Sequence, residues 1–285
     1  MRTEEFYAFM KKRESLRLRK EAGDPWPWSD DEILNTYKFT NVKRSHDRTT
    51  KWFWDVLDNN KDAPLHVILF NCALFRYFGT IEFYESIGWQ PTWNQEIALA
   101  VKARAQIRLD NKQRVFTGAY VITNQGISAP KQEVVVDHFL WPLWHWCSYL
   151  VDVARRTKSW ETVATEMMKL KGFGGTGFMT KEVLQDAMHT EVLADCTDRN
   201  TWCPVGPGAH RGINRLMERD VKARLKTREG LDIMRRLFNA QDEYWPDYGP
   251  GELELHDIQF QLCEFDKHER VKLGQGRPRS KYKRR

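Results

Sequence analysis

Basic side chains gather in one short segment of the chain, together with an acid and an amide. The segment from Phe39 to Trp52 reads FTNVKRSHDRTTKW. Its cationic residues and histidine are Lys43, Arg44, His46, Arg48 and Lys51, and Asn41 and Asp47 lie among them. Arginine can bind a phosphate through two N–H groups while a neighbouring carboxylate orients the guanidinium. The segment therefore predicts a phosphate site, and a capped helix with a solvated basic face is the alternative.

A glycine-rich stretch, GFGGTG from Gly172 to Gly177, fits the spelling of a dinucleotide-binding turn. Such a turn must follow a buried strand. Here the apolar residues on both sides, between 160 and 170 and between 183 and 188, recur at helical spacing instead. A P-loop is excluded because no GxxxxGK[ST] spacing occurs in the chain. The pattern predicts two helices joined by a glycine hairpin, which is a helix-hairpin-helix element.

The hairpin residues suit the binding of a DNA phosphate. Gly172, Gly174 and Gly177 allow the backbone to approach a ligand closely, and the N–H groups that open the second helix favour an anion. Lys171 can add a charged contact. The alternative is an ordinary glycine-rich connection between two core helices.

A third candidate region runs from Leu193 to Leu216. It contains Asp195 and Asp198, followed by a second glycine-rich turn, VGPGAHRG, with Gly206, Gly208 and Arg211 near a helix start. This turn predicts another anion site. Helix capping is the alternative for the aspartates, and a plain loop is the alternative for the glycines.

Helical periodicity dominates the rest of the chain, so we expect an all-α protein. The expected helices span residues 2–21, 30–38, 46–58, 65–78, 94–109, 133–157, 159–170, 177–189, 209–221, 228–240 and 254–264. Ser29 is the expected cap of the second helix, and Pro142 should kink the sixth. A strand is suggested only by residues 114–123, and a loop with a short helix fits that segment equally well. We expect one helical domain over residues 1–266, or two helical lobes with the hairpin near 159–189, and a basic tail over 267–285.

Composition narrows the class of protein. No apolar run is long enough to span a membrane, and the charged N-terminus is unlike a signal peptide. We therefore expect a soluble, cytoplasmic protein with no membrane partner. The five cysteines are scattered and never form CxxC, and the histidines show no HExxH spacing, so neither a metal site nor a cofactor is expected.

The basic charge of the chain is concentrated at its C-terminal end. Residues 267–285 hold nine lysine and arginine residues and one acid, Glu269, a net charge of +8. The whole chain carries +6, which leaves −2 for residues 1–266. This end is typical of a flexible arm that follows a polyanion, with Tyr282 available to stack on a base, or of a solubilising tail.

Taken together, these segments resemble the alpha-glutamyl/putrescinyl-thymine pyrophosphorylase family, which includes phage amino acid:DNA transferases, and the helical domain of 5-hydroxymethyluracil DNA kinases. The similarity covers residues 24–272 or so. It rests on WSDDEILNTYKFTNVKRSHDRTTKW, FNCALFRYFGT, GAYVIT, LKGFGGTGFMTKEV, VGPGAHRGINRL and LCEFDKHERV. A kinase needs a P-loop domain, and this sequence has no such motif, so the transferase is the better match.

The resemblance implies a helix-hairpin-helix DNA-glycosylase-like fold and a role in thymine hypermodification of phage DNA in the host cytoplasm. The partners would be double-stranded DNA carrying 5-hydroxymethyluracil activated as a phosphate or pyrophosphate ester, an amino acid or polyamine whose nitrogen displaces the ester, and an upstream DNA kinase. A glycosylase-like enzyme that excises a modified base, and a non-catalytic DNA-binding module, remain the alternatives.

The resemblance also implies roles for the candidate residues. Asp195 is the expected general base, with Asp198 as its neighbour. The leaving phosphate would contact Lys43, Arg44, His46, Arg48 and Arg211. The base pocket would contain Asn41, Asp47, Asn71 and Arg76. The DNA backbone would contact Lys171, Gly172, Gly174, Gly177, Gly206 and Gly208.

Overall fold

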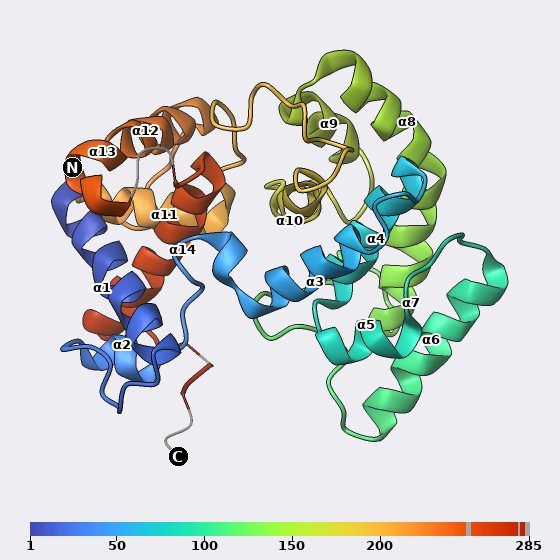
Figure 1. The fold of residues 1–285 in the computed structure, drawn as a ribbon, viewed down its shortest axis with the longest axis horizontal. Coiled ribbons are helices and arrows are strands. Elements are labelled where there is room, and N and C mark those ends of the chain that lie inside the picture. Colours follow the sequence, from blue (N-terminus) through green and yellow to red (C-terminus); the bar gives the residue numbers. More distant parts are fainter. Residues whose placement is uncertain (249–251, 279, 283–285) are drawn as a thin grey trace. The chain divides into compact units, whose positions relative to one another are not determined.

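The structure, a computed structural model, describes residues 1–248, 252–278 and 280–282. Over these ranges it contains helices, turns and one isolated bridge between Tyr37 and Lys281, and no strand, which confirms the all-α expectation. The chain folds into two compact units (Figure 1). The first unit comprises Met1–Asp47 and Asn200–Arg285, and the second comprises Arg48–Arg199. Whether the chain is one domain, as expected, stays a prediction.

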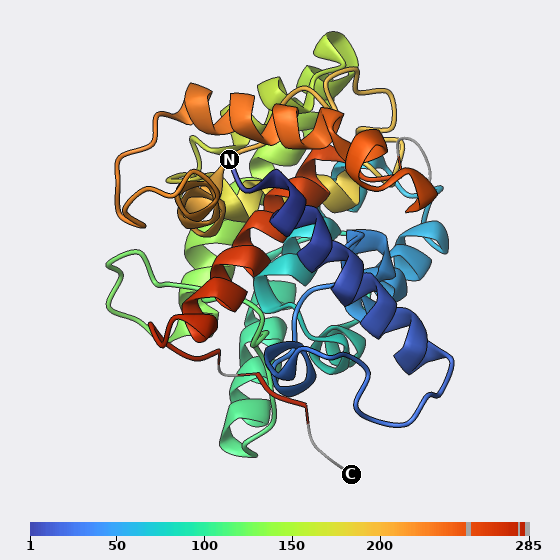
Figure 2. The same ribbon diagram turned by 90° about the vertical axis from the view of Figure 1, so that its left-hand side faces the viewer.

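The first unit is built around its last helix, α14. Its elements are α1 (Thr3–Glu21), α2 (Glu32–Thr36), η1 (Arg44–His46), α11 (Gly206–Leu216), α12 (Thr227–Asn239), α13 (Gln241–Tyr244), η3 (Pro246–Tyr248) and α14 (Leu255–Lys272). Helix α14 packs against α1, α2, α11 and α12 (Figure 2). Phe6 and Phe9 of α1 meet Phe265 edge to face, so aromatic side chains join the two ends of the sequence.

The second unit is built around α4. Its elements are α3 (Arg48–Asp58), α4 (Leu65–Phe78), α5 (Ile81–Ile87), α6 (Gln95–Asp110), α7 (Lys131–Glu133), the π-helix η2 (Val134–Leu140), α8 (Trp141–Thr157), α9 (Trp160–Met167) and α10 (Phe178–Ala187). Every residue of α4 from Val67 to Phe78 is buried. A helix that is buried on all sides must be covered by neighbours, and α8 and α10 pack on it.

Several helix ends differ from the sequence prediction. The second helix begins at Glu32, because Asp31 rather than Ser29 accepts the N–H groups of Ile33 and Leu34. The expected helix at 133–157 begins as the π-helix η2. Pro142 lies in the first turn of α8, where its missing N–H costs little. The short helices α5 and α13 were not expected at all.

The segment at residues 114–123 forms no strand and lies between α6 and α7. It is held to the end of α4, since Thr117 N donates to Phe78 O and Tyr120 Oη donates to Arg76 O at 2.5 Å. No other segment of the described ranges pairs with it as a strand, and its backbone and side chains form single hydrogen bonds to α4 instead. The β-branched and aromatic residues of this segment therefore belong to a loop that lies against α4.

The basic C-terminal end starts inside a helix. Helix α14 continues to Lys272, so the first residues of the expected tail are helical. Further on, Lys38 N donates to Ser280 O and Tyr282 N donates to Thr36 O. The Tyr282 ring meets Trp28 edge to face, 5.5 Å between centroids. The structure therefore holds Tyr282 against the first unit, which corrects the prediction of a ring available to stack; residues 279 and 283–285 lie outside the described residues.

No helix within the described ranges is both long and apolar enough to cross a membrane.

Candidate functional site

The glycine hairpin joins α9 to α10, with a helix on each side as the spacing predicts. Gly172 has a φ of +96°, and a Cβ there would lie 2.5 Å from both Phe139 Cγ and Tyr77 Oη. Gly174 faces the Met168 carbonyl, 2.8 Å from where its Cβ would be. Both positions demand glycine for space, and Gly172 demands it for its positive φ as well. The hairpin is thus pressed onto α4 and onto the π-helix, an element often found near functional sites.

Helix α10 opens directly from the hairpin. Gly177, at φ +71°, is its N-cap, and no side chain caps the helix. The first-turn N–H groups of such a helix favour an anion. Thr180 Oγ1 donates to Phe173 O at 2.8 Å and closes the turn from inside. Lys171 is exposed beside it. This arrangement is suited to a phosphate of a DNA backbone.

The basic cluster comes together in the first unit around η1. Arg44 Nη1 donates to Asp47 Oδ2 at 2.7 Å, and the guanidinium lies 4.8 Å from the Phe260 ring centroid. Asp47 Oδ1 also accepts the Asn41 N–H, and the Asn41 amide donates to His46 O. Asp47 therefore orients Arg44, as the sequence predicts. Asn41 helps to fix the turn, and its assignment to a base pocket stays a prediction.

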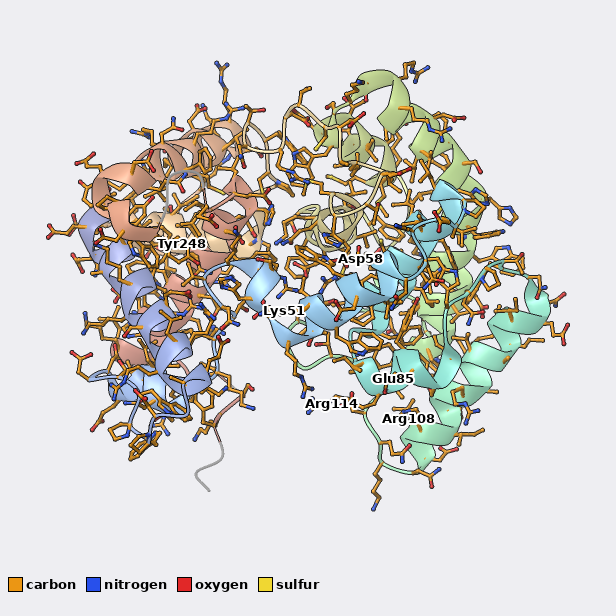
Figure 3. All side chains as sticks on the ribbon, viewed as in Figure 1. Lys51, Asp58, Glu85, Arg108, Arg114 and Tyr248 are labelled. Carbon is orange, nitrogen blue, oxygen red and sulfur yellow. The ribbon has the colours of Figure 1, made fainter. Side chains whose placement is uncertain are left out.

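The other basic candidates lie outside η1: Lys43 is its N-cap residue, Arg48 and Lys51 belong to α3, and Arg211 belongs to α11. Lys43 Nζ is 2.5 Å from Glu252 Oε2. Arg48 and Lys51 are exposed in α3, in the second unit (Figure 3). Arg211 on α11 donates through Nε to Asp266 Oδ2 at 2.9 Å, and its side chain is 43% exposed. Arg44 is thus the arginine that its surroundings orient most closely.

A buried acid that sequence reasoning missed underlies η1. Asp257 Oδ1 accepts the Arg44 N–H at 2.8 Å, and Oδ2 accepts the Glu254 N–H at 3.0 Å, which completes a capping box at the start of α14. Burial raises the pKa of Asp257 to about 7, although these two N–H groups act to lower it. The Glu-x-x-Asp spacing of Glu254 and Asp257 was the only signal of this capping box in the sequence, and it does not reveal that Asp257 is buried.

Asn71 and Arg76 are interior residues of the second unit. Asn71 is fully buried. Its side-chain NH2 group donates to Val67 O and Gln90 O. Its side-chain oxygen accepts from the Tyr84 hydroxyl and the Gln90 N–H. Arg76 is 2% exposed and forms a double ion pair with Asp186, at 2.5 Å for each contact. Their polar groups are committed to the core, which corrects the prediction that they line a base pocket.

The two candidate catalytic aspartates differ in environment. Asp198 accepts the Ser159 hydroxyl at 2.7 Å and the Trp160 and Glu161 N–H groups at 2.8 and 3.0 Å. It therefore caps α9, which is the capping alternative weighed above.

Asp195 is 84% exposed, 3.8 Å from Lys158 Nζ, beside a cavity of about 100 Å³ that Arg155, Lys158 and Glu191 also line. The burial that a general base would need is absent there, and its catalytic role stays a prediction.

The second glycine turn lies where α11 packs closely on α14. Gly206, at φ +69°, opens α11, and a Cβ at Gly208 would lie 2.7 Å from Cys263 Sγ on α14. A Cβ at Gly212 would lie 2.2 Å from Leu262 O. Glycine at these positions lets α11 and α14 approach closely. Packing is therefore one reason for glycine at these positions, and the assignment of Gly206 and Gly208 to DNA binding stays a prediction.

Helix α10 carries a charged pair that sequence reasoning also missed. Lys181 and Glu182 are 0% and 1% exposed, with Lys181 Nζ 3.2 Å from Glu182 Oε1. Charged residues at helical spacing usually lie on a solvated face, so the sequence offered no signal for their burial. Among the described residues, no group of three or more His, Cys, Asp or Glu side chains is arranged to hold a metal ion.

Comparison with known proteins places the chain in a family. The family model described as "5-hmdU DNA kinase, helical domain" matches residues 1–277. The chain belongs to this family. A 5-hmdU DNA kinase of Bacillus phage SP10 is 26% identical over 272 residues, covering 86% of this chain and 41% of the relative. The chain therefore spans about two fifths of that relative's length. No solved structure matches significantly. The predicted relation to the kinases' helical domain is confirmed, and the match to the transferases stays a prediction.

Proposed function

We propose that this chain modifies 5-hydroxymethyluracil in DNA by replacing an activated ester at the exocyclic carbon with an amine from an amino acid or a polyamine. Membership of the 5-hmdU DNA kinase helical family across residues 1–277 is the observation that carries the proposal. An upstream DNA kinase would supply the phosphate ester. The sequence contains no P-loop spacing with which the chain itself could bind ATP in that way.

DNA binding is proposed to use the hairpin. The N–H groups at the start of α10 and the exposed Lys171 would hold a backbone phosphate. These contacts carry no sequence information, so they would position the duplex without selecting a sequence. A helix-hairpin-helix glycosylase-like architecture is part of the proposal, because enzymes of that kind act on single bases within a duplex.

The reacting carbon lies on a base that is stacked in the duplex, so the base must be extruded into the enzyme. Extrusion costs a few kcal/mol, which stacking and phosphate contacts offset. Arg44, oriented by Asp47, is proposed to contact the phosphate ester. Its two or more N–H donors would stabilise the charge that grows on the ester oxygens as the bond to carbon breaks.

A second candidate function is a DNA-binding module that presents 5-hydroxymethyluracil to a kinase. The relative from phage SP10 favours it, because that protein is named a kinase and this chain spans 41% of its length. In this case the chain would bind modified DNA without changing it.

The test is mass spectrometry of nucleosides from a duplex that contains phosphorylated or pyrophosphorylated 5-hydroxymethyluracil, after incubation with the protein and a pool of amino acids and polyamines. An amine adduct establishes the transferase and identifies its donor. Arg44→Met should lower adduct formation by roughly 10²-fold, while Arg235→Met, a surface arginine of the same unit, serves as the matched control. Asp195→Ala tests the predicted general base.

Two further reactions separate the alternatives. Incubation of a duplex containing unphosphorylated 5-hydroxymethyluracil with ATP tests for a kinase. Release of free base tests for a glycosylase. An unchanged substrate in all reactions, with the duplex tightly bound, would refute the transferase and favour the binding module.

A further inference from the structure

Helix α10 has an unusual composition for an interior helix. Thr180, Lys181, Glu182, Gln185 and Asp186 are each 3% exposed or less. The helix packs on α4 and α9. Charged residues are seldom buried unless they are paired, and interior helices are ordinarily apolar all round. The polar residues of α10 therefore call for individual explanations.

Two of the five residues have structural roles. Thr180 Oγ1 donates to the Phe173 carbonyl and closes the hairpin. The Asp186 carboxylate accepts hydrogen bonds from Nε and Nη2 of Arg76 and, at 3.1 Å, from the Trp54 Nε1–H. These contacts tie α10 to α3 and α4. They do not account for the burial of the other three residues.

Lys181, Glu182 and Gln185 form a second group. Gln185 lies four residues after Lys181 and three after Glu182, so its side chain is a neighbour of both on the helix surface. Lys181 Nζ is 3.2 Å from Glu182 Oε1 and 5.4 Å from the Phe178 ring centroid. Gln185 Nε2 is buried and has no hydrogen-bond partner among the described residues. A buried amide donor without an acceptor is a costly feature that a ligand carbonyl would satisfy.

A buried Lys–Glu pair is not an efficient way to stabilise an interior helix. A buried ion pair is often no more stabilising than apolar side chains of similar size. Such pairs, with desolvated charges of opposite sign, are instead frequent at functional sites. The group also directly follows the hairpin: at a rise of 1.5 Å per residue, it begins roughly 6 Å and ends roughly 12 Å along the helix from Gly177.

From this juxtaposition we infer that Lys181, Glu182 and Gln185 form the site for the extruded base and its ester. The inference rests on the proposed function and deepens it. Gln185 Nε2 donates to a carbonyl oxygen of the uracil ring, and the Lys181 ammonium binds the ester phosphate. Lys181 thus takes the role that the proposed function gives to Arg44, and the Arg44→Met and Lys181→Met variants decide between the two. The base displaces the side chains that cover this face, and its stacking and hydrogen bonds offset the cost.

The pair then supports a balanced substitution. When Lys181 turns to the phosphate, the Glu182 carboxylate takes a proton from the ammonium of the incoming amino acid or polyamine. The freed nitrogen lone pair forms the bond to the exocyclic carbon. The carbon–oxygen bond breaks, and its electrons leave with the phosphate or pyrophosphate, which accepts the proton from Glu182. Nothing is oxidised or reduced, and no further reactant is needed.

The experiment compares Glu182→Gln, Lys181→Met and Gln185→Leu with the wild-type chain. Two exposed residues of the same unit provide matched controls: Glu85→Gln, on α5 (Figure 3), and Lys61→Met. Rates of adduct formation are measured by mass spectrometry over a range of duplex concentrations up to saturation, which gives both kcat and KM. We expect Glu182→Gln to lower the rate by roughly 10²- to 10⁴-fold, and Gln185→Leu to raise KM for the duplex more than it lowers kcat.

A binding measurement makes the inference testable even if no adduct forms. The ratio of Kd values for an unmodified duplex and for one containing phosphorylated 5-hydroxymethyluracil reports recognition of the ester. Lys181→Met should lower this ratio towards 1, while the affinity for unmodified DNA, which depends on the hairpin, is retained. Thermal unfolding checks that each variant is folded, and Lys181→Arg, which keeps the charge, should retain part of the discrimination.

The possible outcomes separate the two proposals. Adduct formation that persists in Glu182→Gln and Lys181→Met overturns the inference and leaves the transferase intact. If the wild-type chain forms no adduct, the transferase fails. A Kd ratio that is the same in wild type and Lys181→Met then overturns the site as well, and a ratio that falls supports it as a recognition site for the phosphorylated base.

Discussion

The buried carboxyl of Asp257 should make the stability of the chain fall as the pH rises from about 4 to about 7. Its pKa is about 7 in the folded chain, against an ordinary value of 3.8. Between these values the folded chain holds a proton that the unfolded chain has lost, so unfolding is increasingly favoured as the pH rises. The full difference of about 3 pKa units corresponds to roughly 4 kcal/mol, at 1.36 kcal/mol per unit.

The variant Asp257→Asn removes this titration. Its amide oxygen can still accept one of the two N–H groups that Asp257 binds, those of Arg44 and Glu254, and the lost hydrogen bond should cost about 1 kcal/mol at every pH. Relative to wild type, the variant should therefore gain stability steadily between pH 4 and pH 7, by at most about 4 kcal/mol. Above pH 8 the difference should be constant.

Urea unfolding of both chains at half-unit intervals from pH 4.5 to pH 8.5 measures this difference. Taking the difference removes the titration of other groups, among them Glu269, whose pKa the neighbouring His268 and Arg2 hold at about 2. Asp232→Asn, an exposed aspartate of the same unit, is the control and should give a flat difference. If the profiles of wild type and Asp257→Asn run parallel, the carboxyl is ionised in the folded chain and the reasoning is refuted.

Three further predictions concern the second unit. Arg76→Met should destabilise the chain by about 3–5 kcal/mol, because it leaves the Asp186 charge buried and unpaired, and Arg76→Met combined with Asp186→Leu should recover much of the loss in urea unfolding. Gly172→Ala should lower the free energy of unfolding by about 3 kcal/mol or more, because the added Cβ would lie 2.5 Å from neighbouring atoms. Gly175→Ala has open space around it and should lower it by only about 1–2 kcal/mol, for its positive φ. Equal losses of stability in thermal unfolding would contradict the packing argument. Lys171→Ala should lower the salt dependence of DNA binding by about one unit in the slope of log K against log salt, and an unchanged slope would remove Lys171 from the DNA contacts.

Helices were predictable because their signals are local. The expected span 65–78 is the span of α4, and the expected start at residue 2 and end at residue 21 lie within one residue of α1. Periodic apolar residues and caps report on neighbours three or four positions away. At residues 114–123 the sequence left a strand and a loop with a short helix both open, because strand formation requires a partner segment that the local sequence does not contain. The structure shows a loop there.

Arg44 shows which contacts of the candidate site could be predicted from the local sequence. Its ion pair with Asp47 spans three residues, and the sequence predicted that the acid of this cluster orients an arginine without saying which one. The hydrogen bond from its backbone to Asp257 spans 213 residues, and only the fold reveals it.

Sequence by itself therefore determined the helical class, the glycine hairpin and the local Arg44–Asp47 pair, all of which depend on spacings within a turn or two of helix. Tertiary structure decided which polar residues are buried. It placed Arg76 against Asp186 in the core, covered Lys181 and Glu182, left Asp195 in solvent, and turned Gly208 towards α14. The physical reason is that burial depends on packing between segments far apart in the chain, and no single segment encodes it.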